Sequence, residues 1–353
     1  MEYNLGRVED IISAFTSIQQ KQETTNEHLY RLSTTVSAIN AKVVNRLEVL
    51  KSQIYVFSSS MGWLGVWDNN TGDYKGFVNV GTSSSAEITI AEKTGDVFLL
   101  AGDGHRIFKI DPYLPAIKGV LLFEAVASFT VSPGGKRIFV SQDNSNILLE
   151  IDVQSANIIR KLVLPGTGRH MVYPKAYLIY FSVAGTKAVY SVQHLSGEVA
   201  KVFDLPDDAV KMAPYKFGNK FGLLVLSGNG DAAAITRWDN ATNTTSTVQV
   251  PNASEIVVNP YTGQYYVASM QNVIFMSLDG TVLKTVDLGD TAGHLTLTAD
   301  GNHLVAVVSA GNDSLIVDTI TGVVSTGPRA IYPPTQQVAE LLVSLAQFGF
   351  TSN

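Results

Sequence analysis

Histidine and carboxylate residues have the widest chemical use in this sequence, so their spacing is the first test for a catalytic or metal site. The chain has six histidines, and none lies in an HExxH or HxH arrangement that would place two ligands on one face. Carboxylates pair at Asp207 and Asp208 and at Asp96 and Asp103, but neither pair fits a calcium loop. The absence of cysteine excludes disulfides and thiolate sites. The sequence therefore predicts no catalytic residues, no metal and no cofactor.

Acidic turn phrases recur along most of the chain and identify the elements that carry its polar residues. Phrases such as VWDNNTG, EIDVQSAN and VDTITG place an Asp at the end of an apolar run of strand length. The equivalent positions lie 39 to 45 residues apart and are Asp68, Asp111, Asp152, His194, Asp239, Asp279 and Asp318. This period is the length of one four-stranded propeller blade. The chain is therefore predicted to be mainly β, with seven such units.

The turn phrases also carry a resemblance to a known repeat. The segments SPGGKRIFV, TADGNHLVAV and LIVDTITGVV resemble the YVTN-type β-propeller repeat, over about residues 53–332. The resemblance implies a seven-bladed β-propeller but no particular activity, because such propellers include enzymes, surface proteins and binding modules. The first unit lacks an inner strand, and we expect a closing strand at about residues 326–332 to supply it.

The first strands of propeller blades line the central channel, so polar residues on them are candidates for a binding pocket. His170 and His294 open the first strands of the fourth and seventh units. Arg169 and Arg329 are candidate cations at the channel mouth. The predicted channel pocket is therefore Arg169, His170, His294 and Arg329, with plain solvated channel residues as the alternative.

The first fifty residues lack the turn phrases, contain no Pro and have Gly6 as their only Gly. Their apolar residues are spaced alternately four and three apart, which is typical of a coiled-coil seam. The predicted oligomerisation positions are Val8, Ile11, Phe15, Ile18, Gln22, Leu29, Leu32, Val36, Ile39 and Val43. We expect a helix over about residues 7–51 that forms a homo-oligomer, with a trimer favoured over a dimer. A helix folded back on its own domain is the alternative.

These patterns divide the chain into three parts. Residues 1–52 are the predicted coiled-coil stalk, residues 53–334 the propeller, and residues 335–353 a C-terminal helix and tail. The helix is predicted from the spacing of the apolar residues in TQQVAELLVSLAQFG.

Charge and hydropathy exclude several kinds of partner. The net charge is −6 with no basic cluster, so nucleic-acid binding is not expected. No apolar run is long enough for membrane insertion, and the first residues do not resemble a secretory signal.

A stalk that presents binding heads suits an attachment protein without enzymatic activity. We expect a virion spike or fibre-like component, with copies of itself, other particle or surface proteins, and a host receptor or glycan as partners. The expected location is a virion or extracellular surface, with the cytoplasm as the alternative. A lactonase-like propeller hydrolase and a propeller scaffold for protein–protein interaction are the alternative functions.

Overall fold

The fold was analysed in a computed structural model of the full chain. The structure describes residues 13–33 except 19, 23, 26, 27, 30 and 31, and residues 343–345. Between these it describes residues 53–329 except 59–61, 69–73, 83–86, 92, 93, 102, 112–114, 176, 219, 299 and 309–312. The chain divides into two compact units, residues 1–49 and 50–353.

The described strands of the second unit form seven antiparallel sheets of four strands each. The first two sheets consist of β28 (Val343–Leu345), β1 (Gln53–Ser58), β2 (Trp63–Asp68) and β3 (Tyr74–Asn79), and of β4 (Glu87–Ile90), β5 (Val97–Ala101), β6 (Arg106–Asp111) and β7 (Ala116–Leu122). The third and fourth consist of β8 (Val126–Val131), β9 (Arg137–Gln142), β10 (Ile147–Asp152) and β11 (Ile158–Val163), and of β12 (Gly168–Lys175), β13 (Leu178–Val183), β14 (Ala188–Gln193) and β15 (Val199–Asp204).

The remaining three sheets repeat the same order of strands. They consist of β16 (Ala209–Phe217), β17 (Lys220–Ser227), β18 (Ala234–Asp239) and β19 (Thr244–Gln249), of β20 (Ala253–Val258), β21 (Tyr265–Ser269), β22 (Asn272–Met276) and β23 (Val282–Asp287), and of β24 (Ala292–Leu297), β25 (His303–Val308), β26 (Asp313–Asp318) and β27 (Val324–Arg329). A single turn of 3-10 helix, η2 (Gly230–Ala232), lies between β17 and β18.

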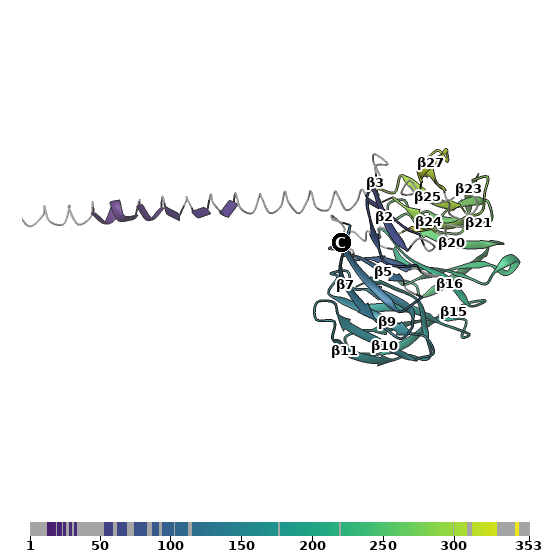
Figure 1. The fold of residues 1–353 in the computed structure, drawn as a ribbon, viewed down its shortest axis with the longest axis horizontal. Helices are drawn as coiled ribbons and strands as arrows, with labels where there is room; N and C mark the ends of the chain where they lie inside the picture. Colours follow the sequence, from purple (N-terminus) through teal and green to yellow (C-terminus); the bar gives the residue numbers. More distant parts are fainter. Residues whose placement is uncertain are drawn as a thin grey trace, which may run out of the picture. The chain divides into compact units, whose positions relative to one another are not determined.

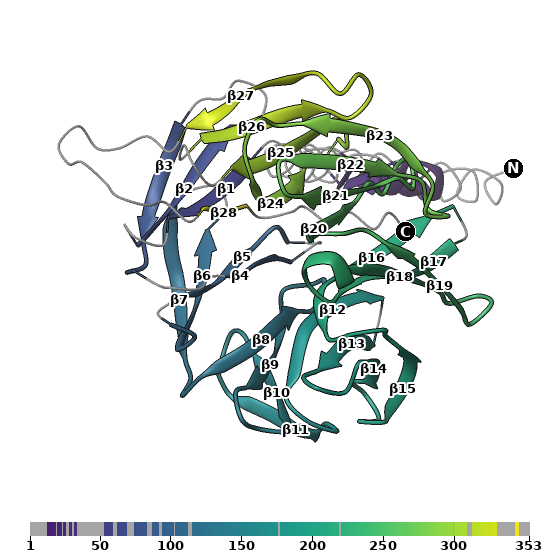
Figure 2. The same cartoon turned by 90° about the vertical axis from the view of Figure 1, so that its right-hand side faces the viewer.

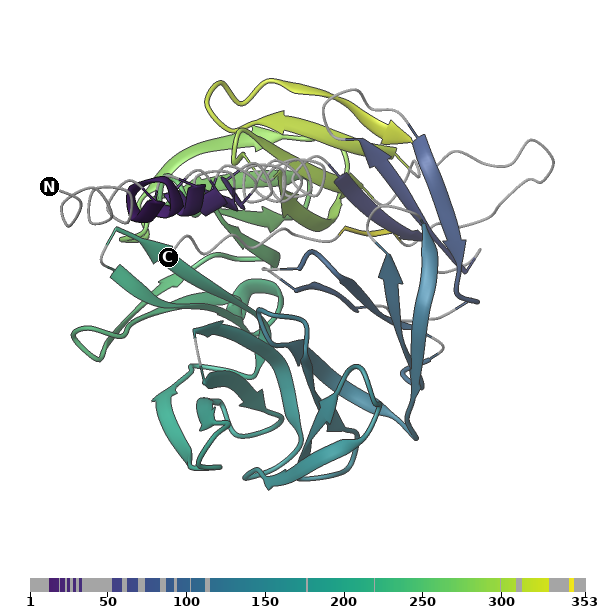
Figure 3. The same cartoon turned by 90° about the vertical axis from the view of Figure 1, so that its left-hand side faces the viewer.

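The sheets are arranged around a common axis, as Figures 1, 2 and 3 show from three directions. The inner strands β4, β8, β12, β16, β20, β24 and β28 each contact the next, and β28 contacts β4. This arrangement confirms the predicted mainly β fold and propeller architecture. A closed ring leaves no sheet without a neighbour on either face, which limits the exposed apolar surface.

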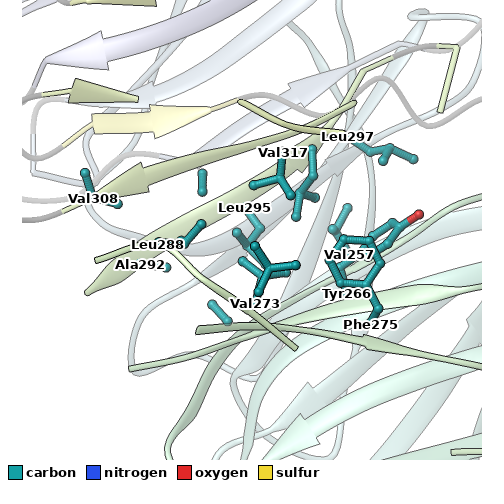
Figure 4. Close-up of a cluster of buried hydrophobic side chains, with 14 residues drawn as sticks. Val257, Tyr266, Val273, Phe275, Leu288, Ala292, Leu295, Leu297, Val308 and Val317 are labelled. Atoms are coloured by element: carbon teal, nitrogen blue, oxygen red, sulfur yellow. The ribbon is translucent and has the colours of Figure 1, made fainter. Parts of the chain in front are cut away.

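The hydrophobic core is divided into clusters that lie between consecutive sheets. In the cluster of Figure 4, Tyr266 and Phe275 of one sheet pack with Leu295, Leu304 and others of the next. The rings of Tyr266 and Phe275 pack edge to face, with their centroids 4.8 Å apart. Corresponding clusters join each pair of consecutive sheets from the first to the sixth. The second to sixth sheets therefore bury both faces, and this explains why their second strands are almost continuously apolar.

Recurring Asp residues stabilise the turns that follow β10, β18 and β26, the third strands of their sheets. In β10 the Asp152 Oδ1 atom accepts hydrogen bonds from the backbone N–H groups of Gln154 and Ser155, at 3.1 and 2.9 Å. Asp318 accepts equivalent bonds from Ile320 and Thr321. These are Asx turns, which satisfy backbone donors where the sheet ends.

Two sequence positions in this series were aligned wrongly. In the fourth sheet the turn acceptor is Gln193, which ends β14 and accepts from Ser196 N, whereas His194 lies one residue later. In the sixth sheet Ser277 N bonds Thr281 O as Asp152 N bonds Asn157 O, so Ser277 occupies the Asp position. Asp279 lies two residues further on, where it accepts from Thr281 N. Residue type alone suggested the alignment, whereas backbone pairing sets it.

Substitution of Asp239 tests the contribution of one such turn. Asp239 is 6% exposed and accepts from Ala241 N and Thr242 N at 2.9 and 3.3 Å. Asp239→Ala is expected to lower the free energy of unfolding by about 1–3 kcal/mol, because two backbone donors lose their acceptor. Asp239→Asn keeps one acceptor oxygen and should lose clearly less. Urea unfolding of the three proteins measures this, and equal losses in both variants would contradict the role of the acceptor.

The prediction that residues 326–332 close the ring is wrong. Residues 324–329 form β27, the outer strand of the last sheet, which pairs with β26. The first sheet instead receives its inner strand from β28, which pairs with β1 through Val56 with Leu345 and Ser58 with Val343. The last sheet needs the earlier segment as its own fourth strand, so the chain must continue before it can return to the first sheet. Residues 343–345 are consequently strand, not the predicted helix, and the rest of 335–353 lies outside the described residues.

The first unit is helical where it is described. Residues 13–18, 20–22, 24, 25, 28, 29, 32 and 33 are α-helical. The predicted seam residues Phe15, Ile18, Gln22, Leu29 and Leu32 lie in this helix, whereas Val8, Ile11, Val36, Ile39 and Val43 lie outside the described residues. Association of the helix with other copies stays a prediction. Within the described part of the chain, no helix is long and apolar enough to span a membrane.

Candidate functional site: a polar cluster around the propeller axis

One register position on the inner strands carries polar side chains in sheet after sheet. The residue at this position pairs with the penultimate residue of the second strand. It is Glu87 in β4, Ser128 in β8, Lys211 in β16, Glu255 in β20 and His294 in β24. In the last four, a β-bulge precedes the residue. Because the inner strands surround the axis, these polar groups gather at one level of it.

Glu255 is the centre of the contacts among these groups. Its side chain is 6% exposed, and its two oxygens lie 3.1 and 3.2 Å from Lys211 Nζ. His294 Nδ1 lies 3.4 Å from Glu255 Oε2. The carboxylate therefore joins three neighbouring inner strands, β16, β20 and β24, through side chains alone. We call Glu87, His170, Lys211, Glu255 and His294 the axis cluster.

The Lys211–Glu255 pair keeps both groups charged. Burial alone would raise the pKa of Glu255, but Lys211 and His294 lower it below its usual value. Burial works against the charged form of Lys211, yet the attraction of Glu255 raises the pKa of Lys211. Solvent still reaches 46% of the Lys211 side chain and 40% of that of His294. Solvent therefore partly screens the Lys211–Glu255 pair. A small ligand can reach the exposed faces of Lys211 and His294.

Glu87 lies across the ring from β20 and completes the acidic half of the cluster. Burial raises the pKa of Glu87 to about 7, although Lys211 and a hydrogen bond from the Phe129 backbone act in the opposite direction. Near neutral pH this carboxyl is therefore divided between its protonated and ionised forms. A protonated carboxyl beside a lysine can donate a proton or a hydrogen bond to a bound group.

The raised pKa of Glu87 predicts a loss of stability as the pH rises. The folded protein binds more protons than the unfolded chain between pH 4.5 and about 7, so stability falls across this window and is lowest above it. Glu87→Gln removes this contribution. The free energy of unfolding of the variant minus that of the wild type should therefore be about 1–3 kcal/mol more positive at pH 8 than at pH 5. Urea unfolding of both proteins at the two pH values tests this. An equal difference at both would contradict the assigned pKa.

His170 lies in a strained part of β12. Its backbone φ is +50°, in the left-handed region that residues other than glycine seldom adopt, and the pairing of β12 with β13 is irregular here. Burial, Lys211 and Arg169 lower the pKa of His170 to about 4, while a hydrogen bond with the Ala209 backbone opposes them. His170 is therefore a neutral imidazole near neutral pH, held against the β16 strand.

The structure places two of the four predicted pocket residues in the axis cluster and two outside it. His170 and His294 lie on inner strands, and each interacts with the Lys211–Glu255 pair. Arg169 precedes the bulge and pairs with Asp143, with Arg169 Nη2 2.8 Å from Asp143 Oδ1. Arg329 ends β27, the outer strand of its sheet, so its place in the predicted channel pocket is wrong.

Sequence reasoning missed Glu87, Lys211 and Glu255. These residues share a repeat position with His294, so a strict alignment of inner strands would have identified all three. The histidines drew attention because of their type, whereas the lysine and glutamates looked like ordinary strand residues.

The axis cluster can bind and exchange protons, but it does not form an evident metal site. No group of three or more His, Cys, Asp or Glu side chains suited to a metal occurs among the described residues. What the cluster offers is a lysine, a neutral imidazole, a second histidine and a carboxyl that titrates near neutrality. Such a set suits polar contacts to a small ligand or general acid–base chemistry.

Comparison with known proteins supports the architecture. No family model matches the chain, so the YVTN-type assignment rests on the quoted residues alone, and no curated protein matches it in sequence. Among solved structures, dihydro-heme d1 dehydrogenase NirN in complex with DHE matches with a TM-score of 0.61 and 10% identity, over 78% of this chain and 72% of that one.

Two further solved structures match over most of their own length. Kuenenia stuttgartiensis hydrazine synthase matches with a TM-score of 0.62 and 13% identity, over 76% of this chain and 93% of that one. Apo AztD from Citrobacter koseri matches with a TM-score of 0.57 and 14% identity, over 83% and 97%. At these identities the likeness extends to the fold alone. The chain is a β-propeller protein.

Proposed function

We propose that this chain is an oligomeric attachment protein, in which a coiled-coil stalk of residues 1–52 joins copies of a seven-bladed propeller head. The observation that carries the proposal is the exposed seam of the helix. Phe15, Ile18, Leu29 and Leu32 are 66%, 58%, 58% and 61% exposed. Four large apolar side chains on one helix require a partner surface.

The spacing of these residues favours further copies of the same helix as that partner. Phe15 and Ile18 are three residues apart, as are Leu29 and Leu32, and the two pairs are fourteen residues apart. Fourteen residues are two heptads, so the residues stay on one line of a supercoiled helix. A face that packed on a globular domain would be wider. Isoleucine on one line and mixed residues on the other favour a trimer.

The polar layer within the seam agrees with a register function. Gln22 lies on the seam and is exposed in the single chain. The Thr25 hydroxyl donates to the Lys21 carbonyl oxygen at 2.8 Å, so that residue meets its hydrogen-bonding need within the helix. Polar core layers lower stability but select register and oligomer number. Several heads on one stalk would gain avidity from their high effective concentration, which suits attachment at the surface of a virion or another extracellular particle.

Paired substitutions at neighbouring positions test the stalk. Leu32→Lys places a charge on the seam and should convert the oligomer into monomer, whereas Ser33→Lys adds the same side chain beside it and should leave the oligomer intact. Light scattering coupled to size-exclusion chromatography gives the mass of each. A trimeric mass for the wild type and Ser33→Lys with a monomeric Leu32→Lys supports the proposal. A monomeric wild type, or a trimeric Leu32→Lys, would contradict it.

A lactonase-like hydrolase is the second candidate, favoured by the axis cluster. Glu255 contacts both Lys211 and His294, and general acid–base chemistry requires such groups. Turnover of an ester or lactone panel by the wild type, lost in Glu255→Gln, would support hydrolysis. No turnover by the wild type on this panel would contradict the hydrolase.

A further inference from the structure

A cluster of aromatic rings lies between the third and fourth sheets, near the turns that follow β12 and β14. Phe139 belongs to β9, Tyr173 to β12, Tyr177 to the turn after β12, and His194 to the turn after β14. The His194 ring centroid lies 5.4 Å from that of Phe139, 5.7 Å from that of Tyr173 and 5.4 Å from that of Tyr177. We call these four residues the aromatic platform.

Hydrogen bonds fix the platform in one arrangement. The Tyr173 hydroxyl lies 2.8 Å from His194 Nδ1 and accepts a hydrogen bond from Tyr177 N at 3.1 Å. His194 N in turn donates to the Tyr177 carbonyl oxygen at 2.9 Å. Tyr177 has a left-handed φ of +71°, which a tyrosine seldom adopts. The strained backbone of Tyr177 is thus held by hydrogen bonds at both its N–H group and its carbonyl oxygen.

The platform is buried at its base and exposed at its top. Phe139 is 0% exposed, whereas Tyr177 is 51% exposed and the neighbouring Leu195 57%. About half of the Tyr177 side chain is therefore open to solvent, while the tilted His194 ring contacts it. A rigid, supported and exposed ring binds a flat apolar surface with little loss of side-chain entropy.

Charged side chains surround the platform, and they are paired with one another. Arg160 donates to Glu150 Oε2 from Nη2 at 2.8 Å and from Nε at 3.2 Å, and it donates to the Leu195 carbonyl oxygen at 2.8 Å. Arg137 Nε lies 3.7 Å from Glu150 Oε1, and Arg137 Nη1 bonds Asp152. Glu150, Arg160 and Arg137 all interact electrostatically with His194, so they lie beside the rings.

These charges decide which kind of ligand fits the platform. The two arginines already donate to carboxylates, so neither is left uncompensated to attract an anion. The carboxylates of Glu150 and Asp152 are likewise paired with these arginines, so neither is left uncompensated to attract an ammonium group. What remains is an exposed ring with oriented donors and acceptors at its edge. A neutral sugar presents C–H groups to the negative face of an aromatic ring and hydroxyls to such an edge.

We infer that the aromatic platform with Arg137, Glu150 and Arg160 is a binding site for neutral saccharides on the propeller head. The inference rests on the proposed attachment function and supplies the class of ligand for it. Stacking on Tyr177 provides the apolar contact, and hydroxyl groups of the sugar accept hydrogen bonds from Arg160 and Arg137, which are 31% and 38% exposed and are held in place by the buried Glu150.

Saccharide binding by the full-length chain tests the inference. The probes are galactose, glucose, mannose, N-acetylglucosamine and N-acetylgalactosamine, measured by saturation-transfer NMR, together with an array of neutral and sialylated glycans. Tyr177→Asn removes the ring but keeps a residue that tolerates a left-handed φ. Tyr261→Asn is the matched control, because Tyr261 is also 51% exposed. We expect binding of at least one neutral saccharide, weakened tenfold or more in Tyr177→Asn and unchanged in Tyr261→Asn.

The outcomes separate this inference from the proposed function. No saccharide binding by a trimeric wild type overturns the inference and leaves the stalk in place. Binding that survives Tyr177→Asn, or that is confined to sialylated glycans, also overturns it. Binding that depends on Tyr177 in a chain found to be monomeric supports the saccharide site while contradicting the stalk. Tyr177→Phe keeps the ring and should retain binding, which distinguishes loss of stacking from loss of fold.

Discussion

Deletion of residues 343–353 is expected to lower the melting temperature by about 10 °C and to make the protein prone to aggregation. β28 is the inner strand of the first sheet and pairs with Val56, Phe57 and Ser58 of β1. Without it β1 becomes an open edge, and the contacts of β28 with β24 and β4 that complete the ring are lost. A loss on the order of 6 kcal/mol corresponds to such a shift for a unit of about 300 residues.

A second deletion serves as the control for the first. Removing residues 346–353 leaves β28 in place and should change the melting temperature little. Thermal unfolding followed by circular dichroism, with light scattering for aggregation, compares the two. If residues 326–332 closed the ring, as the sequence suggested, both deletions would have small effects. Similar melting temperatures for the wild type and both deletions would therefore contradict closure by β28.

Substitution of Lys211 should destabilise the head more than substitution of any surface lysine. Lys211→Met leaves the Glu255 carboxylate, which is 6% exposed, with His294 as its one remaining side-chain partner in the axis cluster. Breaking a buried pair by removing one member costs about 3–5 kcal/mol, and the partial exposure of Lys211 reduces this to about 2–4 kcal/mol. The loss should grow with pH, because without Lys211 the pKa of Glu255 rises and its ionised form becomes costly.

Two further variants make this test specific. Lys211→Met combined with Glu255→Gln removes both charges and should recover more than half of the loss. Lys201→Met breaks an exposed ion pair, in which Lys201 Nζ lies 2.5 Å from Asp204 Oδ1. This variant should leave the midpoint of urea unfolding nearly unchanged. Urea unfolding at pH 6 and pH 8 measures all three. A double variant no more stable than Lys211→Met would show that the lost stability comes from packing and not from the unpaired carboxylate.

The axis cluster and the aromatic platform give the head two unlike surfaces. The cluster is charged and lies where inner strands converge, while the platform lies at turns on the boundary of two sheets. The hydrolase alternative depends on the former, and attachment to saccharides depends on the latter. Activity assays on Glu255→Gln and binding assays on Tyr177→Asn therefore probe separate parts of one domain.

The sequence by itself determined the repeat and its elements. A period of 39 to 45 residues and the Asp turns after apolar runs predict four-stranded units, because turn chemistry and strand alternation are local properties. The heptad positions of Phe15, Ile18, Leu29 and Leu32 are likewise readable, since they depend on helical periodicity alone.

Only the tertiary structure decided which segment closes the ring and which side chains meet. Residues 324–329 and 343–345 are both strands, and which of them pairs with β26 and which with β1 depends on where the last sheet ends. Lys211 and Glu255 are 44 residues apart and come into contact because successive inner strands surround one axis. His194 meets Phe139 across the boundary between the third and fourth sheets. These contacts are set by ring closure, which brings distant repeats together and leaves no mark in any single repeat.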